Sequence, residues 1–453
     1  MTRFQFYAGR VKHIAHRRSI QVHPDLLSFL TDCHHNSLPQ HASILPILRT
    51  AHISYLTCNA FLAALSFSRM LRHLQLDLGF KPKVAPLSES SDILLHYLDQ
   101  VARLAHDLET ISIRGSATKR LNAVISSLHN VKVLSLCLGT TLTTDTLLAV
   151  TTFPRLVEFE VHAAHFDVDE LNEHFHNRQS PMFPSLRNLH VRAHAPVIEL
   201  FLHALPNDSL HTLCIEVEDP KCTTVSWVTI FNLICTKSAN TLRNLTIVHH
   251  PEMDYLDLEF NSSSNAHPNT DHDIFVDNRF YIHIPFTNLR ILGGLHHIHR
   301  FILDTALPVG ICDHELELML GWWQELEHLD LGSVHHVNSL PQRRLSSHSL
   351  VIIAKKSRML TSLILPADFD CALNNATTIN LPQQLVLTRL TCTYPFPTTH
   401  THIEVAEYLY RLFPYLQTVD GLSHHEDQWS QTQKALRRLA NQGDSDFHYS
   451  NPL

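Results

Sequence analysis

Histidine is the residue type whose abundance first suggests chemistry in this sequence. The chain has 37 histidines among 453 residues. Several gather in short runs: His296, His297 and His299; His400 and His402; His249 and His250; His335 and His336. A zinc site needs three or four ligands that converge within about 2.0–2.3 Å of the ion, usually with a defined spacing such as HExxH. None of these runs has that spacing, so the sequence predicts no metal site.

The motifs of common catalytic and nucleotide-binding sites are missing as well. The sequence contains neither GxGxxG nor GxxxxGK[ST], and its 11 glycines leave little material for loops that cradle phosphate. The GxSxG turn that exposes a nucleophilic serine is also absent. We therefore expect no cofactor and no enzymatic activity.

Charge and cysteine usage restrict the class of partner. The formal charge is 35 − 43 = −8, and the basic residues form no run, which argues against nucleic acid. The nine cysteines lie mostly inside apolar runs such as HTLCIEV and LSLCLG, without a CxxC pair, which predicts reduced and buried thiols. No stretch reaches about 18 consecutive apolar residues, and the N-terminus has no apolar signal core. We expect a cytoplasmic or nuclear protein that has no membrane partner.

A short apolar phrase recurs along the chain, as in SLRNLHV at 185–191 and TLRNLTI at 241–247. Its positions 1, 4 and 6 are apolar. Nine clear copies begin at Leu71, Leu108, Val131, Leu156, Leu186, Leu210, Leu242, Leu326 and Leu360, and four weaker ones at Leu48, Leu289, Leu387 and Leu416. Positions 4 and 6 fall on one face of an extended segment, so each copy predicts one short strand.

Segments with helical periodicity separate these copies, for instance SDILLHYLDQVARLAHDL and HIEVAEYLYRLF. Several begin with a capping-type residue, such as Ser91, Thr144 and Asp313. The spacing between copies clusters near the roughly 20–29 residues of leucine-rich repeats. The predicted fold is an α/β leucine-rich repeat solenoid, with a curved parallel sheet on the concave side and helices on the convex side. An all-helical array is the alternative, but its units of about 40–47 residues would not repeat the spacing of two residues between apolar positions 4 and 6.

The repeats also suggest an organisation into segments. We expect an N-terminal helical linker or cap at 1–44 and the solenoid at 45–423. Polar, turn-rich stretches predict loop insertions near 249–285 and 366–384. The last segment, 424–453, should form a polar C-terminal helix followed by a disordered tail.

In such a solenoid, the side chains that flank positions 4 and 6 point away from the core onto the concave face. This face should be polar and of mixed sign, which suits recognition of a protein surface. A solvated sheet face without a partner is the alternative for any single residue. The residues that we select as protein-binding are Arg114, Glu158, Glu160, His162, His190, Arg192, Glu216, His328 and Asp330.

The helix–strand repeats over roughly 45–425 resemble the repeat region of F-box/leucine-rich-repeat proteins, especially the set found in mushroom-type fungi. The phrase RFQFYAGRVKHI, from Arg3 to Ile14, looks like the segment that follows the F-box in that set. The resemblance implies an adaptor of a ubiquitin ligase that holds a protein substrate on its concave face.

The sequence departs from that pattern at one point. An F-box opens with a Leu-Pro-x-Glu-like phrase, and SLPQHASILPIL, from Ser37 to Leu48, shares only the Leu-Pro. A Skp1-type adaptor is therefore an expected partner only if an F-box exists upstream. The alternative is a repeat-only interaction scaffold that is unrelated to ubiquitination.

Overall fold

The computed structural model describes most of the chain and divides it into two compact units. The described residues are 3–16, 25, 43–54, 60–79, 88–176, 182–219, 225–251, 284–305, 309–332, 345–370, 382–394, 396–421 and 426–448. Unit 1 is Met1–Ser209 and unit 2 is Leu210–Leu453. Each unit repeats the same alternation of strand and helix.

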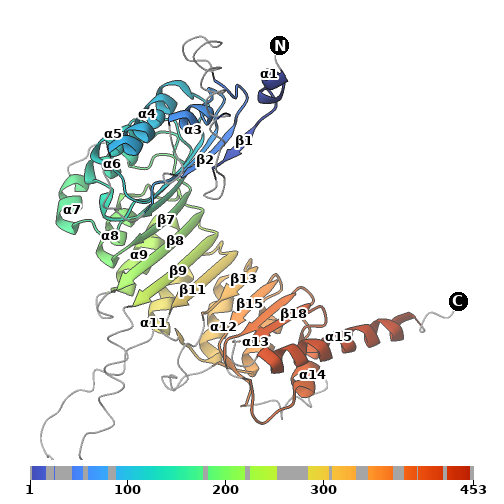
Figure 1. Ribbon diagram of the computed structural model, residues 1–453. Helices are drawn as coiled ribbons and strands as arrows, with labels where there is room; N and C mark the ends of the chain where they lie inside the picture. Colours follow the sequence, from blue (N-terminus) through green and yellow to red (C-terminus); the bar gives the residue numbers. More distant parts are fainter. Residues whose placement is uncertain are drawn as a thin grey trace, which may run out of the picture. The chain divides into compact units, whose positions relative to one another are not determined.

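Unit 1 is a parallel sheet whose strands follow the order of the sequence. The strands are β1 (His13–Ala15), β2 (Thr50–Ser54), β3 (His73–Asp77), β4 (Thr110–Arg114), β5 (Val133–Cys137), β6 (Glu158–His162) and β7 (Asn188–Ala193). The helices are α1 (Arg3–Ala8), α3 (Ala60–Leu65), α4 (Ser88–Leu104), α5 (Lys119–Ile125), η1 (Gly139–Thr141), α6 (Thr144–Val150), α7 (Val168–His176) and α8 (Ala195–Ala204). The helices from α3 to α8 lie along one side of the strands (Figure 1).

Unit 2 continues the same design in a second parallel sheet region, again in sequence order. Its strands are β8 (Thr212–Asp219), β9 (Asn244–Pro251), β11 (Arg300–Thr305), β13 (His328–Asp330), β15 (Ser362–Leu365), β17 (Arg389–Cys392) and β18 (Thr418–Gly421). Two small pairs join β10 (Ile284–Pro285) to β12 (Val309–Gly310) and β14 (Leu345–Ser346) to β16 (Ala367–Asp368).

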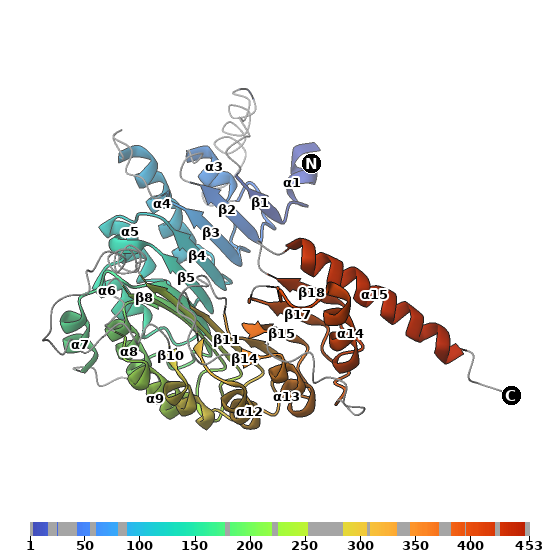
Figure 2. The ribbon, with the colours of Figure 1, turned by 90° about the horizontal axis from the view of Figure 1, so that it is seen from below.

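The helices of unit 2 are α9 (Trp227–Ser238), α11 (Phe286–Leu289), η4 (Arg290–Gly294), α12 (Asp313–Trp322), α13 (His348–Lys356), α14 (His402–Leu412) and α15 (Glu426–His448). Figure 2 shows α9, α12, α13 and α14 along one side of the strands of this unit. None of the helices in the described ranges combines the length and the apolar composition that a membrane span requires.

The register explains why the apolar phrase repeats. In both units, position 4 of each copy lies opposite position 4 of its neighbour, as Leu74 lies opposite Ile111 and Leu329 opposite Leu363. Every position-4 side chain from β2 to β18 is at most 2% exposed. Because strand side chains alternate between faces, this register stacks one buried row against the helices and leaves the flanking side chains on the other face. The predicted α/β leucine-rich repeat solenoid is thereby confirmed as the fold.

Twelve of the thirteen predicted copies coincide with strands, and the copy at Leu289 is wrong. Leu289 ends α11, and Leu292 and Gly294 lie in η4. The spacing of three between Leu289 and Leu292 fits a helical turn, and a glycine at position 6 gives a strand nothing to pack. The strand of this repeat is β11, which buries Phe301 and Leu303.

Several predicted boundaries differ in detail from the structure. The N-caps are Thr143 and Cys312, one residue before the predicted Thr144 and Asp313. The range 1–44 contains α1 and also β1, which pairs with β2. Of the two predicted insertions, 252–283 and 371–381 lie outside the described residues.

Candidate functional site

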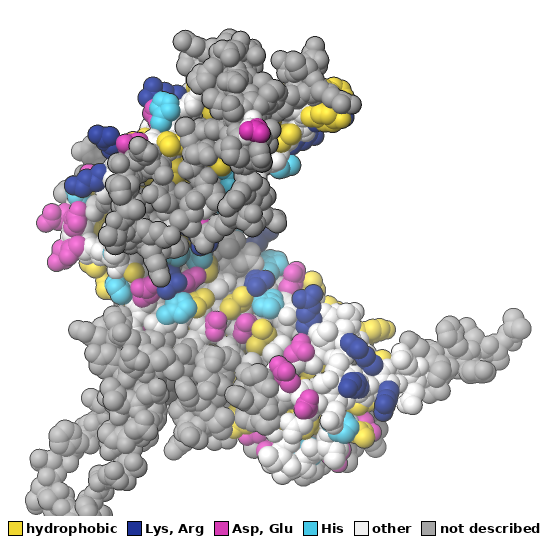
Figure 3. Space-filling model, in the orientation of Figure 1, with side chains coloured by type: hydrophobic (Ala, Val, Ile, Leu, Met, Phe, Trp, Pro, Cys, Tyr) yellow, Lys and Arg dark blue, Asp and Glu magenta, His cyan; other side chains and the backbone are white. Residues whose placement is uncertain are grey.

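The candidate functional site is, within each unit taken by itself, the sheet face opposite the buried rows, which we call the open face. Its side chains flank the buried positions on each strand and are exposed or half-buried. Its polar and charged members include Asp77 on β3, Arg114 on β4, Ser135 and Cys137 on β5, Glu158, Glu160 and His162 on β6, Asn188, His190 and Arg192 on β7, Glu216 on β8, Arg300 and Asp304 on β11, and His328 and Asp330 on β13. Figure 3 shows acidic, basic and histidine side chains interspersed on the molecular surface.

Six of the nine selected residues share the open face of unit 1. Glu158, Glu160 and His162 alternate along β6, and His190 and Arg192 lie on β7 directly opposite Glu160 and His162. Arg114 lies on β4, with β5 between it and β6. The period of two in each strand and the constant register therefore bring these six side chains onto one surface.

Cys137 is the member of this surface that the sequence analysis misassigned to the core. Its side chain is half-buried, since β5 buries Leu134 and Leu136 and turns Cys137 to the open face. The Cys137 Sγ lies 3.6 Å from the His162 Nε2 and 3.8 Å from the Glu160 Oε1. Burial and the adjacent Glu160 carboxylate raise the pKa of the Cys137 thiol above its usual value.

Ion pairs link further side chains across the strands of unit 1. The His190 Nδ1 lies 3.6 Å from the Glu160 Oε1, and the Arg114 Nε lies 3.7 Å from the Asp77 Oδ1. These pairs are partly exposed, so each contributes at most about 1 kcal/mol to stability. Their main consequence is that charges of both signs are held at fixed places on the sheet.

In unit 2, two of the selected residues lie together and the third lies apart. His328 and Asp330 share β13, where His328 lies opposite Arg300. Burial, assisted by Arg300 and Arg389, lowers the pKa of His328, whereas burial raises the pKa of Asp330 despite the hydrogen bond that the Gly332 N–H donates to it at 2.9 Å. Glu216 is on β8, separated from β13 by β9 and β11, and its carboxylate lies 3.5 Å from the His250 Nε2.

A buried polar cluster ends the strands β8, β9 and β11 in unit 2. The His249 Nε2 lies 3.3 Å from the Asp219 Oδ2, and its Nδ1 lies 3.2 Å from the Thr305 Oγ1. The side chains of His249 and Asp219 are each 1% exposed. Burial lowers the pKa of His249 below the usual imidazole value, although Asp219 opposes this change. The imidazole is therefore a structural group of the core and is not available to a ligand.

This cluster makes the stability of unit 2 dependent on pH. The unfolded chain binds a proton at His249 near pH 6.5, whereas the lowered pKa of the folded imidazole delays protonation to a lower pH. This contribution is therefore present above pH 6.5 and is lost as the pH falls from there through the folded pKa. Urea unfolding at pH 7.5, 6.5 and 5.5 should show a larger loss of stability for the wild type than for His249→Gln. His314→Gln changes an exposed histidine of α12, and its free energy of unfolding should depend on pH as that of the wild type does. The same pH dependence of the unfolding free energy in the wild type and in His249→Gln would contradict this assignment.

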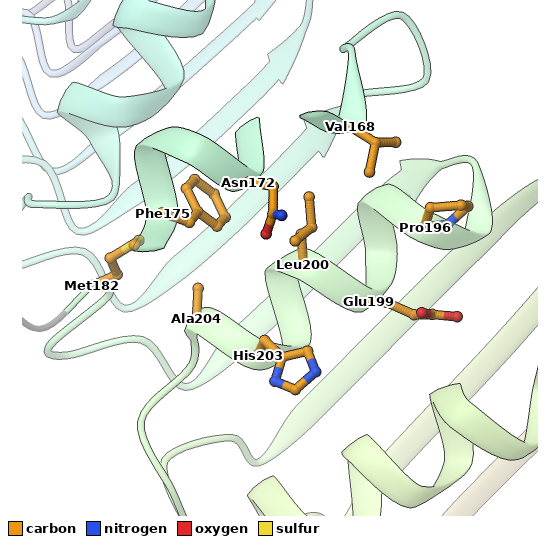
Figure 4. A pocket seen from close by; sticks show the side chains of 9 residues that line it. All are labelled: Val168, Asn172, Phe175, Met182, Pro196, Glu199, Leu200, His203 and Ala204. Carbon is orange, nitrogen blue, oxygen red and sulfur yellow. The ribbon is translucent and has the colours of Figure 1, made fainter. Parts of the chain in front are cut away.

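A groove of about 480 Å³ lies on the helix side of unit 1, between α7 and α8. Figure 4 shows Phe175 of α7 and Leu200 of α8 beside it, whereas Glu199 and His203 of α8 point away from Phe175. Burial raises the pKa of the Glu199 carboxyl. The groove is mainly apolar and brings no converging set of polar groups to one point, so it gives no indication of catalysis.

Comparisons with known proteins give no family but give structural similarities. No family model matches the chain. No curated protein matches it either. Among solved structures, the chain is similar to the yeast complex of Rad7 and Elc1, with 15% identity and a TM-score of 0.47 over 88% of this chain and 82% of that one. It is also similar to an internalin (inlF) of Listeria monocytogenes, with 11% identity and a TM-score of 0.38 over 85% of this chain and 88% of that one. The fold assignment rests on the strand register and the buried rows of this chain itself.

Proposed function

We propose that the chain is a non-catalytic protein-recognition module whose open face binds another protein. The observation that supports it is the contrast between the two sheet faces. Position-4 side chains are at most 2% exposed, whereas the alternating side chains of β6 and β7 remain half-buried or exposed and are mostly charged or polar. Side chains held on a rigid sheet lose little conformational entropy when a partner binds.

The mixed sign of the open face favours a folded protein as the partner. Glu158 and Glu160 lie on β6 and Arg192 lies on the adjacent strand β7, so a partner needs complementary charges of both signs at matching places. A polyanion such as nucleic acid would be repelled by the two carboxylates. A protein surface with interspersed charges meets the requirement better.

We further propose that this partner is the substrate of an F-box/leucine-rich-repeat type ubiquitin ligase adaptor. The resemblance of the repeats and of the segment Arg3–Ile14 to that group supports the proposal. A Skp1-type adaptor would then join through an F-box upstream of this segment. A repeat-only interaction scaffold without a link to ubiquitination is the competing function.

Affinity capture of the native gene product from its host separates these two functions. Reproducible co-purification of a Skp1-type adaptor and a cullin would support the ligase adaptor. Their reproducible absence, with other proteins enriched, would support the scaffold. In both cases the captured proteins supply the partner for a test of the open face.

Charge reversal tests whether the open face is the binding surface. Arg114→Glu together with Arg192→Glu should weaken binding of the captured partner by about tenfold or more, because each reversal places like charges against each other. The matched control is Lys119→Glu together with Arg120→Glu, which reverses two exposed basic residues on α5 at the helix side. The control should bind as the wild type does. Unchanged binding by the open-face variant, or loss in the control alone, would overturn the assignment, and titration calorimetry with circular dichroism measures both affinity and folding.

A further inference from the structure

Cys137, Glu160 and His162 form a cluster on the open face of unit 1 that has the composition of a metal site. One ligand atom from each of the three residues lies within 4.8 Å of the other two. The residues come from two adjacent strands: Cys137 ends β5, and Glu160 and His162 alternate along β6. The sheet therefore brings together a thiol and an imidazole that are 25 residues apart in the sequence.

The two distances from Cys137 in this cluster fit the edges of a tetrahedron around zinc. With zinc–sulfur and zinc–nitrogen bonds of about 2.3 and 2.0–2.1 Å, tetrahedral geometry places the two ligand atoms about 3.5 Å apart. The Cys137 Sγ and His162 Nε2 are 3.6 Å apart, and the Cys137 Sγ and Glu160 Oε1 are 3.8 Å apart. Both separations suit hydrogen bonds of a thiol, and both are also close to those that two ligands of one ion require.

One carboxylate of the cluster favours a cation. The Glu160 Oε1 lies 3.8 Å from the Cys137 Sγ, so Glu160 would bring a negative charge to an ion bound there. A divalent ion binds the thiolate form of cysteine, so its binding releases the thiol proton to solvent. Arg114 lies opposite Cys137 in the register, and its Nε lies 3.7 Å from the Asp77 Oδ1.

A second histidine lies within ion-pair distance of the carboxylate. The His190 Nδ1 lies 3.6 Å from the Glu160 Oε1. Carboxylate ligands of metal sites are commonly held by such a second group, and its loss typically weakens metal binding by about 10–100-fold. The remaining coordination position would be taken by water or by a group from a bound partner.

We propose that Cys137, Glu160 and His162 bind a zinc ion, with His190 orienting Glu160. Sulfur and imidazole ligands select zinc and similar transition metals over magnesium or calcium, which prefer oxygen ligands. The site has three protein ligands from two strands, so the ion would cross-link β5 and β6 on the open face. The site does not depend on whether the open face binds a protein.

Cobalt substitution gives a direct test, because Co²⁺ bound by a thiolate absorbs through a sulfur-to-metal charge-transfer transition. Metal-free protein titrated with Co²⁺ should develop this band at one equivalent, and Zn²⁺ should abolish it by competition. The band should be absent in Cys137→Ser and present in Cys312→Ser, a control in which serine can still cap α12. Zn²⁺ affinity, measured by this competition, should fall by at least about 100-fold in His162→Gln and by about 10–100-fold in His190→Gln.

A second measurement uses only the wild-type protein and so does not depend on the folding of variants. One equivalent of Zn²⁺ should slow alkylation of Cys137 by iodoacetamide, followed by peptide mass spectrometry, and leave the rate at Cys312 unchanged. Absence of the thiolate band in the wild type, its persistence in Cys137→Ser, or equal alkylation of Cys137 with and without Zn²⁺ would each overturn the proposal.

Discussion

Replacing Phe159 with alanine should lower the free energy of unfolding of unit 1 by about 4 kcal/mol. Phe159 occupies the buried row of β6 and has no exposed surface. Its ring centre lies 5.9 Å from that of Phe183, which in turn lies 6.1 Å from that of Phe201 on α8. Removal of the Phe159 ring therefore leaves a cavity between the sheet and the helices. The repeats of β5 and β7, on either side of β6, also lose contacts with that ring.

The matched control is Glu158→Ala, one residue earlier on the same strand but on the open face. Its side chain is exposed, so the change should stay within about 0.5 kcal/mol. Urea unfolding gives the free energies, and amide hydrogen exchange locates the effect. Exchange should accelerate in β5, β6 and β7, because a solenoid repeat is stabilised mainly by its immediate neighbours. Similar losses in the two variants would show that Phe159 does not support the core.

Much of the fold follows from local patterns in the sequence. The spacing of two between positions 4 and 6, as in Leu189 and Val191, is incompatible with one helix face and identifies a strand wherever the intervening residue is polar. The pattern failed at Leu289 because the spacing of three also fits a helical turn. It missed β1 because this strand has only Ile14 between two exposed residues, without a second apolar position.

The candidate site was predictable only in part. Alternation places Glu160, His190 and Arg192 on the open face, and the structure brings them together. The grouping of Cys137 with His162 depends on the register between two strands that lie 25 residues apart, and nothing local encodes this register. Cys137 was grouped with buried thiols because its neighbours are apolar. Alternation from Leu134 and Leu136 could have placed it on the open face.

The C-terminal helix closes the last repeat of unit 2 through one aromatic side chain. Trp429 of α15 is 1% exposed, and its ring centre lies 5.0 Å from that of Phe396 and 5.8 Å from that of Phe369. The indole also lies against Gly421 at the end of β18, where an added Cβ would come within 1.9 Å of the Trp429 Cδ1. The Gln433 Nε2 donates a hydrogen bond to the Gln417 carbonyl at 2.7 Å. A terminal repeat needs such a cover, because no further repeat protects its apolar edge.

Trp429→Ala should therefore destabilise unit 2 by about 4 kcal/mol and release α15 from β18. Trp429→Phe is the matched variant: it keeps an aromatic ring, and among the described residues the indole Nε1 has no hydrogen-bond partner to lose, so the expected change is below about 1.5 kcal/mol. Hydrogen exchange should show faster exchange in β17, β18 and α15 of Trp429→Ala, with unit 1 unaffected. Gly421→Ala should reproduce this pattern from the opposite side of the contact, because the added methyl group displaces the indole. If α15 stayed protected in both variants, the helix would be held by contacts other than Trp429.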